Sequence, residues 1–215
     1  MREPTRLFVV RHGQTAWNAE TRMQGQLDSA LDAVGEHQAE RVAAALRGEA
    51  IDLIIASDLQ RTMHTAAPLA RALGLPVTPE RGLRERCFGE FEGYTYSEIA
   101  ARWPEGAQRW RERDLHFAPS GGESLIEFNA RCVKTAERLC TAHAGATMAW
   151  FTHGGVLDCL YRAATRVSVD VPRSWTLDNA AINRLLHSDQ GLMLVSWGDS
   201  AHLDAAFGAT PTATE

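Results

Sequence analysis

One stretch of sequence decides the fold: Leu7-Phe8-Val9-Val10-Arg11-His12-Gly13-Gln14-Thr15-Ala16-Trp17-Asn18. Its apolar run ends abruptly in a cation, an imidazole and a glycine. This pattern predicts a buried strand that delivers His12 to its carboxyl end and then turns into a helix. A second copy of the design lies far downstream: Met148-Ala149-Trp150-Phe151-Thr152-His153-Gly154-Gly155. Because ligands bind at the carboxyl edge of open α/β sheets, we expect both histidines in one pocket, and the arginines nearby suggest that it holds an anion.

The remaining periodicity predicts an α/β fold. Strand signals fall at 7–10, 52–56, 147–152, 181–187 and 192–197, and helical patterns cover 34–46, 58–73, the stretch after Ser124, and 154–164. Two pairs stand at the spacing of a capping box, Ser57 with Gln60 and Ser124 with Glu127. Strands that alternate with helices predict a mostly parallel sheet covered on both faces. The last two strands are joined by a short polar turn at 188–191 and read as a hairpin, so the sheet is expected to be mixed.

Composition excludes several classes of protein. Of the 215 residues, 45% are apolar and 23% are charged, as in soluble globular proteins. No apolar run approaches the roughly 20 residues that a membrane span needs. We expect no signal peptide, because the first residues lead directly into the first predicted strand. The net charge of −5 argues against a general nucleic-acid or acidic-membrane surface. We expect one cytoplasmic domain over residues 1–215, whose partner is a small molecule.

Two segments differ from the rest. Residues 90–122 carry tryptophans, several arginines and a Pro-Ser-Gly-Gly run, and we expect a helical insertion over the active edge, a small lid. The small, polar tail after Phe207 is expected to fray. The four cysteines are scattered without a C-x-x-C pair, which is typical of reduced thiols. Cys132 and Cys140 share one helical stripe and are expected in the core.

The Arg11-His12 pair suits covalent phosphoryl transfer. A neutral imidazole can attack phosphorus, and an adjacent guanidinium disfavours its protonation. The same guanidinium binds two phosphoryl oxygens at once. Arg61 is expected in the first turn of a helix, where the helix dipole disfavours a cation unless an anion shares the site. A proton donor must also be present, but chemistry alone does not choose among Glu85, Glu90 and Glu92.

Together these motifs resemble the histidine phosphatase superfamily, the phosphoglycerate-mutase-like group. The matching segments run in order from about Arg6 to Trp197: Arg11-His12-Gly13, Ser57-x-Leu59-x-Arg61, Leu83-x-Glu85-x-x-x-Gly89-x-x-Glu92-Gly93, Gly122-Glu123-Ser124 and Thr152-His153-Gly154-Gly155. The resemblance implies a three-layer α/β/α fold and a phosphatase that forms a phosphohistidine on His12. It implies that Glu85 is the proton donor and that Arg11, Arg61 and His153 bind the phosphoryl oxygens.

The resemblance also assigns the rest of the pocket. It implies phosphate-binding positions at Asn18, Gln24, Gly25 and Gly154, and it places His64 at the pocket floor, where many relatives have glutamine. It implies no cofactor and no metal, because two arginines and a histidine carry the charge. Dimers occur in this family, so a homodimer is an assembly that the resemblance allows, although no stripe in this chain marks an interface.

Two further functions stay open beside the phosphatase. A cofactor-dependent phosphoglycerate mutase would return the phosphoryl group to another hydroxyl. Hydrolysis is favoured by the short chain, by the Glu92-Gly93 ending of the acid motif, and by Gly155 where mutases resemble H-G-N. A module that binds phosphorylated ligands without catalysis is the alternative from another class.

Other hydrolase classes lack their motifs. A serine hydrolase would need a G-x-S-x-G elbow, and a zinc hydrolase would need clustered histidines; the sequence has neither. We expect the five histidines elsewhere in the chain to be surface or satisfied residues: His37, His116, His143, His187 and His202. The substrate is expected to depend on the insertion, where five residues are candidates for contact with it: Trp103, Arg109, Trp110, Arg111 and Arg113.

Overall fold

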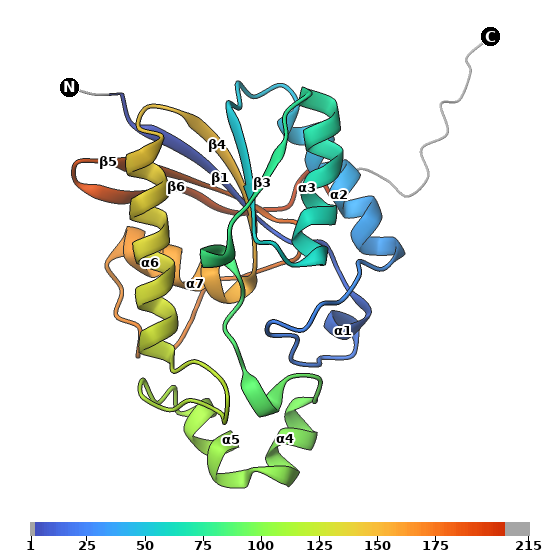
Figure 1. Cartoon of the computed structure of the whole chain (residues 1–215), viewed down its shortest axis with the longest axis vertical. Helices are drawn as coiled ribbons and strands as arrows, with labels where there is room; N and C mark the ends of the chain where they lie inside the picture. The colour runs from blue at the N-terminus through green and yellow to red at the C-terminus, as the bar shows by residue number, and fades with distance from the viewer. Residues whose placement is uncertain (1–2, 205–215) are drawn as a thin grey trace.

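A six-stranded sheet organises the protein, of which the computed structural model describes residues 3–204 (Figure 1). The strands are β1 Thr5–Arg11, β2 Leu53–Ala56, β3 Val77–Pro79, β4 Thr147–Thr152, β5 Ile182–Ser188 and β6 Gly191–Asp199. In space their order is β3-β2-β4-β1-β5-β6. The first four run parallel, whereas β5 is antiparallel to β1 and forms a hairpin with β6. The prediction of a mixed, mostly parallel sheet is confirmed.

Helices cover both faces of this sheet, because successive side chains of a strand point to opposite sides. The covering helices are α2 Ala33–Leu46, α3 Gln60–Leu73, α6 Leu125–Ala142 and α7 Gly154–Thr165. Leu7 and Val9 of β1 pack in one core cluster with α6 and α7. Phe8 and Val10 pack in the other, with α2 and α3. The fold is therefore the three-layer α/β/α arrangement that the resemblance implied.

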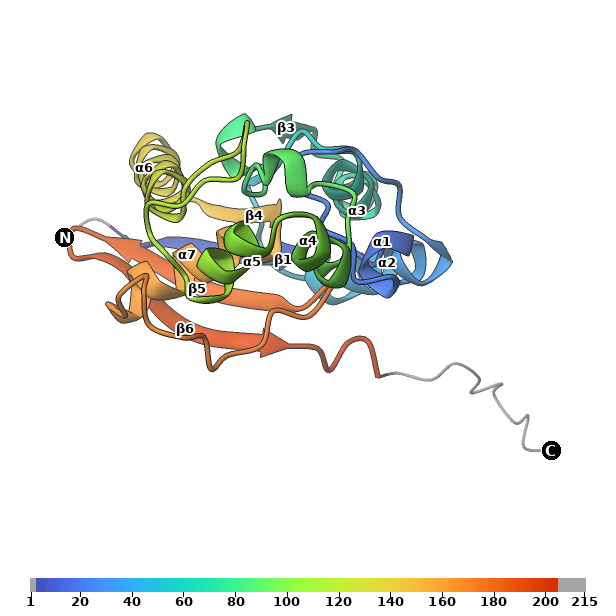
Figure 2. The same cartoon turned by 90° about the horizontal axis from the view of Figure 1, so that it is seen from below.

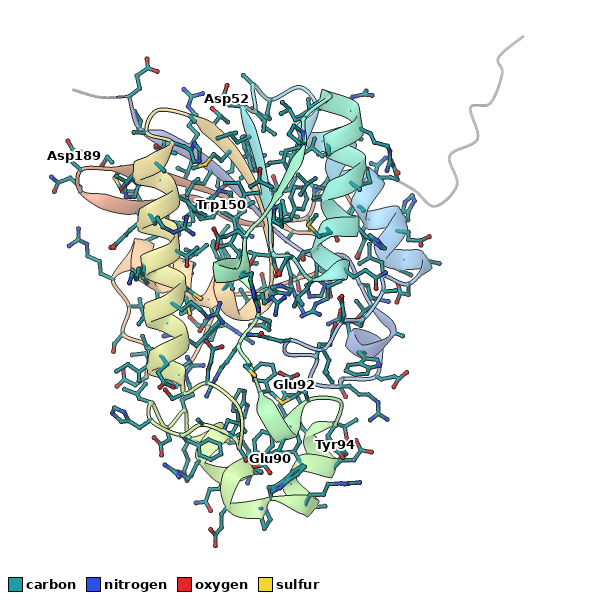
Figure 3. The ribbon with its side chains drawn as sticks, viewed as in Figure 1. Asp52, Glu90, Glu92, Tyr94, Trp150 and Asp189 are labelled. Carbon is teal, nitrogen blue, oxygen red and sulfur yellow. The ribbon has the colours of Figure 1, made fainter. Side chains whose placement is uncertain are left out.

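Trp150 of β4 lies at the centre of the sheet, and Figure 3 shows it in the middle of the molecule. Its side chain is fully buried, in the same cluster as Cys132, Cys140 and Cys159. These cysteines are free thiols that pack in the core, as predicted for Cys132 and Cys140.

The insertion forms a separate layer beyond the end of the sheet. It contains α4 Tyr96–Arg102 and α5 Pro104–Arg111, which Figure 2 shows lying across the carboxyl ends of the strands. These helices enclose a small cluster of their own, built around Phe91 and Ile99 with Met23 from the segment after β1. The predicted helical insertion is confirmed.

Of the two predicted capping boxes, one is present in the structure and the other is not. Ser124 caps α6 and forms the box with Glu127 as expected. The box at Ser57 is wrong, because α3 begins after Leu59 without a side-chain cap.

The helix predicted after His12 is only a single turn, α1 Ala16–Ala19. The edge strand β3 was not predicted. None of the helices within residues 3–204 combines the length and apolar character of a membrane span. The predicted fraying after Phe207 lies outside the described residues.

Candidate active site

The carboxyl ends of three parallel strands meet at one edge of the sheet. In register, Arg11 of β1 lies beside Thr152 of β4, and Ala56 of β2 lies beside Phe151. The next residues along these strands are therefore neighbours, namely His12, His153 and Ser57. The His12 amide donates to the Thr152 carbonyl (2.9 Å), and the two imidazole rings lie 5.3 Å apart between centroids. The predicted convergence of the histidines is confirmed.

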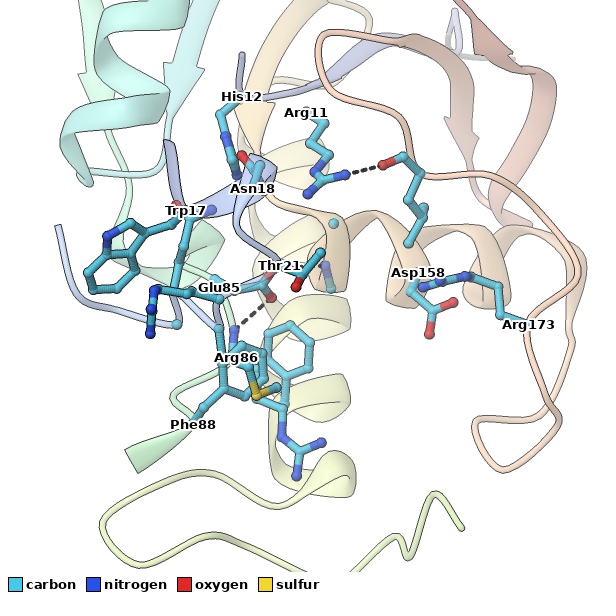
Figure 4. Close-up of a pocket in the computed structure, with 18 of the residues that line it drawn as sticks. Arg11, His12, Trp17, Asn18, Thr21, Glu85, Arg86, Phe88, Asp158 and Arg173 are labelled. Atoms are coloured by element: carbon cyan, nitrogen blue, oxygen red, sulfur yellow. Dashed lines mark hydrogen bonds between the residues drawn. The ribbon is translucent and has the colours of Figure 1, made fainter. Parts of the chain in front are cut away.

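A cavity of about 690 Å³ opens beside these residues and is closed from the far side by the insertion (Figure 4). Strand ends, the segment after β1, the acid loop, the insertion and the loop before β5 all contribute to its walls. The predicted residues on its lining are Arg11, His12, Asn18, Gln24, Gly25, Arg61, Glu85 and Gly154. His153 lies fully buried behind them, in contact with the His12 ring.

The tautomer of His12 is set by its own backbone. Nδ1 lies 2.8 Å from the carbonyl oxygen of Gly13, which can only accept, so Nδ1 carries the proton. The lone pair is then on Nε2. Burial, together with the charges of Arg61 and Arg11, lowers the His12 pKa well below 6.5. His12 is therefore a neutral imidazole with a free nitrogen nucleophile at neutral pH.

Close packing explains why glycine follows His12. The Gly13 amide donates to the Thr65 hydroxyl on α3 (2.9 Å). A Cβ at this position would lie 2.6 Å from the Gly35 carbonyl oxygen, which belongs to the start of α2. Only glycine permits β1, α2 and α3 to approach this closely.

Main-chain carbonyls hold the two arginines that accompany His12. Arg11 donates to the Leu177 carbonyl (Figure 4), and Arg61 donates to the carbonyls of Leu27 (2.9 Å) and Gly25 (2.7 Å). Burial lowers the pKa of Arg61 to about 10, which still leaves this residue charged at neutral pH. Burial also lowers the pKa of Arg11. The Nε atom of each is buried without a partner among the described residues. These buried, incompletely paired cations fit an oxyanion such as a phosphoryl group.

Ser57 orients the second histidine. Its hydroxyl accepts a long hydrogen bond from the Leu59 amide (3.4 Å) and lies 2.9 Å from Nε2 of His153. If the hydroxyl donates to Nε2, the ring proton stands on Nδ1, which is buried without a partner. Burial and the Arg61 charge lower the His153 pKa well below 6.5, so this ring is also neutral. In that tautomer its Nδ1–H is an unpaired donor, in a ring that lies directly behind His12.

The structure separates the three glutamates that the sequence left equivalent. Glu85 lines the cavity, and its two oxygens accept from the backbone amides of Arg86 (2.8 Å) and Gly155 (3.0 Å). Glu92 accepts from the amides of Gln26 and Phe88, and Glu90 accepts from that of Ser120. Figure 3 places both at the insertion, away from the sheet. Of the three, Glu85 is therefore the glutamate whose side chain lines the cavity.

Of the other predicted pocket residues, two line the cavity and one does not. Asn18 accepts from the Thr15 amide (3.1 Å) and Gln24 accepts from Ser29 (2.7 Å), while both line the cavity. The expectation for His64 is wrong, because this residue is exposed on α3 and does not line the cavity. The helix turns it away from the face that carries Arg61 and Thr65.

Of the five insertion residues proposed to contact substrate, Trp110 and Arg113 line the cavity. The other three do not. Trp103 packs on Phe91 (5.4 Å between ring centroids), Arg109 pairs with Asp114 (2.8 Å), and Arg111 is exposed at the last position of α5.

The loop between α7 and β5 is a part of the site that sequence reasoning missed. It supplies five residues of the cavity wall, Arg173, Trp175, Thr176, Leu177 and Asp178. The available signal was an arginine and a tryptophan in an aperiodic stretch directly before a strand. Tyr96 and Asp158 also line the cavity and were not predicted. Within residues 3–204, no group of three or more His, Cys, Asp or Glu side chains is arranged to hold a metal ion.

Comparisons with known proteins agree with this geometry. The sequence profile of the Histidine phosphatase superfamily (branch 1) matches residues 7–200. Phosphoglycerate mutase-like protein 4 of Arabidopsis thaliana is 37% identical over 203 residues, covering 92% of this chain and 86% of the relative. The metal-independent phosphoserine phosphatase of the same plant is 35% identical over 207 residues, covering 94% and 85%.

Solved structures give the same picture. Bacillus stearothermophilus YhfR superposes with a TM-score of 0.87 at 28% identity, covering 93% of this chain and all of that one. The mycobacterial glucosyl-3-phosphoglycerate phosphatase in complex with VO3 has a TM-score of 0.80 at 33% identity, covering 93% and 100%. The relatives include both phosphatases and mutase-like proteins, and together they support a phosphatase activity. This chain belongs to the histidine phosphatase superfamily.

Proposed function

We propose that the protein is a phosphomonoesterase that hydrolyses small phosphorylated metabolites through a phosphohistidine on His12, with Glu85 as the proton donor. The observation that carries the proposal is the neutral His12 ring. Its Nδ1 proton is bound by the Gly13 carbonyl, and two buried guanidinium groups lie close enough to lower its pKa. A nucleophile and the charges that would stabilise a transferring phosphoryl group therefore share one cavity.

The first half-reaction forms the phosphoenzyme. Nε2 of His12 attacks phosphorus in line, the N–P bond forms, and the P–O bond to the leaving group breaks. Glu85 gives a proton to the departing alkoxide, a step that contributes about 10²–10⁴-fold in rate. Arg11, Arg61 and the Nδ1–H of His153 bind the equatorial oxygens, where charge accumulates.

The second half-reaction restores the enzyme. Glu85 takes a proton from a water molecule, the water oxygen attacks phosphorus, and the N–P bond breaks. The products are inorganic phosphate, neutral His12 and protonated Glu85, so the cycle is balanced. Two arginines and a histidine carry the charge, and we propose that no metal ion takes part.

The test is substitution of the nucleophile. His12→Ala is expected to retain less than a few per cent of wild-type turnover of p-nitrophenyl phosphate and to form no acid-labile phosphoenzyme. His64→Ala is the matched control, because this histidine is exposed on α3 outside the cavity. Wild-type turnover that survives EDTA and falls with vanadate supports the metal-independent mechanism. Absence of turnover with every monoester tested would favour the non-catalytic binding module.

A mutase is the second candidate, favoured by the 37% identity to a phosphoglycerate mutase-like protein. It uses the same half-reactions but returns the phosphoryl group to a second hydroxyl. Incubation with 3-phosphoglycerate and 2,3-bisphosphoglycerate separates the two. Release of inorganic phosphate supports the hydrolase, and exchange between phosphoglycerate isomers without phosphate release supports the mutase.

A further inference from the structure

Arg131 of α6 binds the backbone of the segment that carries Glu85. Its Nη1 donates to the carbonyl oxygens of Gly82 and Arg84 (3.0 Å each), and its Nη2 donates to that of Glu85 itself (3.2 Å). The Glu123 carboxylate takes the rest of the guanidinium, because Oε1 accepts from Nε and Oε2 accepts from Nη2 (2.8 Å each). All five N–H donors of the arginine are therefore used, three on carbonyls of this segment and two on Glu123.

Glu123 binds the same segment on the other side of Glu85. Its Oε2 also accepts from the backbone amide of Cys87 (2.8 Å). The Glu123–Arg131 ion pair thus contacts the main chain before, at and after Glu85. Neither side chain of the pair lines the cavity, so neither is placed to touch a substrate. Any effect of the pair on the reaction must pass through the position of Glu85.

The orientation of the Glu85 carboxylate depends on where this backbone lies. One carboxylate oxygen accepts from the amide of the next residue, Arg86, and the other accepts from the amide of Gly155. A shift of the main chain at 85–86 relative to α7 would therefore stretch one of these bonds. A displacement of about 1 Å at a reacting group can lower the rate on the order of 10²-fold.

The charge state of Arg131 is fixed at neutral pH. Burial acts to lower its pKa, but the hydrogen bonds to Glu123 and the nearby charges, that of Glu85 among them, raise the pKa above its ordinary value. The side chains of Arg131 and Glu123 are 25% and 23% exposed, so the pair is partly shielded from solvent. Removal of one partner alone then leaves the other charge partly buried and unpaired.

We infer that Arg131, paired with Glu123, is a positioning residue that holds Glu85 where it can protonate the leaving group. This inference rests on the proposed function, with Glu85 as its acid. It applies equally to a mutase, because the first half-reaction is the same. Loss of Arg131 should therefore impair protonation of the leaving group, while the attack by His12 and the binding of the phosphoryl oxygens stay as they are.

The experiment compares esters whose leaving groups differ in basicity: p-nitrophenyl phosphate, phenyl phosphate and glycerol 3-phosphate. The measured quantity is kcat/KM, which covers the steps up to release of the leaving group and excludes hydrolysis of the phosphoenzyme. Arg131→Gln should lower kcat/KM about 100-fold for glycerol 3-phosphate but less than about fivefold for p-nitrophenyl phosphate, with phenyl phosphate between them. Inhibition by vanadate should stay at the wild-type level, because the groups that bind the phosphoryl oxygens are unchanged.

Arg138→Gln is the matched control. Arg138 lies on the same helix and also pairs with a glutamate, Glu80, but none of its hydrogen bonds among the described residues goes to the backbone of 82–87. Its substitution should leave the dependence of kcat/KM on the leaving group as it is in the wild type. Arg131→Lys should recover part of the loss, since lysine keeps the charge but has three donors for five acceptors.

The partner of Arg131 provides a second test. Glu123→Gln should show the same pattern with a smaller loss, because the three carbonyl bonds of Arg131 can persist. The double variant should lose no more than Arg131→Gln alone, since the two residues act as one unit. If Arg131→Gln loses its cooperative urea transition, the comparison of esters is made with Glu123→Gln and Arg131→Lys.

The outcomes separate this inference from the proposed function. An equal loss on all three esters, no loss, or the same pattern in Arg138→Gln would overturn the role given to Arg131. If the wild-type enzyme still turns over p-nitrophenyl phosphate through an acid-labile phosphoenzyme, the proposed function stands in that case. If the wild-type enzyme turns over no monoester, both fail.

Discussion

The backbone amide of Gly155 donates a hydrogen bond to Oε2 of Glu85 (3.0 Å), so the first turn of α7 fixes the carboxylate that faces the cavity. The fit is tight. A Cβ at position 155 would lie 2.2 Å from the other carboxylate oxygen and 3.0 Å from the Phe128 ring. Glycine at this position is therefore a condition for the placement of Glu85.

Gly155→Ala should lower kcat about 100-fold or more, because a displaced Glu85 no longer protonates the leaving group efficiently. Single-turnover kinetics with p-nitrophenyl phosphate and with an alkyl phosphate provide the measurement. The hydrolysis rate of the alkyl phosphate should fall more, because its alkoxide leaving group is more basic than p-nitrophenolate and depends more on protonation by Glu85. Gly48→Ala is the control, because nothing lies within 4 Å of a Cβ there. Equal activity of the two variants would contradict the role given to Gly155.

Ser57 provides a second positioning test. Ser57→Ala removes the hydroxyl that lies 2.9 Å from Nε2 of His153 and frees the ring to change tautomer. We expect a loss in kcat/KM of about tenfold and weaker inhibition by vanadate. The free energy of unfolding should fall by about 1–3 kcal/mol, because the substitution leaves buried polar atoms of His153 and Leu59 without their partner. A variant with wild-type affinity for vanadate would show that His153 needs no such support.

Stability should depend on pH through the two buried histidines. The pKa values of His12 and His153 are lowered well below 6.5, first by burial and then by Arg61. Below pH 6.5 the unfolded chain binds protons that the folded chain does not, so the free energy of unfolding falls as the pH is lowered. The expected slope is about 1.4 kcal/mol per pH unit for each histidine.

Urea unfolding between about pH 7.5 and about pH 5.5 measures this slope. His12→Gln should remove the contribution of one histidine, whereas His64→Gln should leave the slope as it is, because His64 is exposed. A slope that His12→Gln does not change would mean that His12 is charged in the folded protein.

Trp150 should dominate the stability of the central sheet. Its side chain is fully buried, and Trp150→Ala is expected to cost about 3–5 kcal/mol of unfolding free energy. Trp150→Phe should cost only about 1–2 kcal/mol, because the ring nitrogen that it removes has no hydrogen-bond partner among the described residues. Chemical denaturation of both variants tests this order, and similar losses would indicate that the indole nitrogen is bonded after all.

The parts of the fold that sequence predicted well are those with strong periodicity. The strand ends at Arg11 and Thr152 are recognisable because an apolar run stops at a polar triplet, and parallel topology then brings the histidines together. The strand β3 was missed because three residues that end in Pro79 carry no alternation, and only pairing with β2 makes them a strand.

The incorrect and missed predictions at the candidate site have a different cause. Ser57 has the sequence features of a helix cap, but its hydroxyl contacts His153 instead. The wall that contains Arg173 lies in a loop without periodicity, and its distance from His12 along the chain conceals their proximity. Local pattern identifies which residues bear chemistry, whereas loop residues reach the site only through the tertiary fold.

Peptide carbonyls, rather than side chains, hold Arg11 and Arg61: those of Leu177, Leu27 and Gly25. A carbonyl is present whatever amino acid occupies the position. Mutations that exchange side chains in these loops can therefore alter which molecules are accepted while the anchoring of both guanidinium groups persists. Because the backbone holds the guanidinium groups and the side chains select the ligand, substrate selectivity can evolve while the anion-binding arrangement is kept.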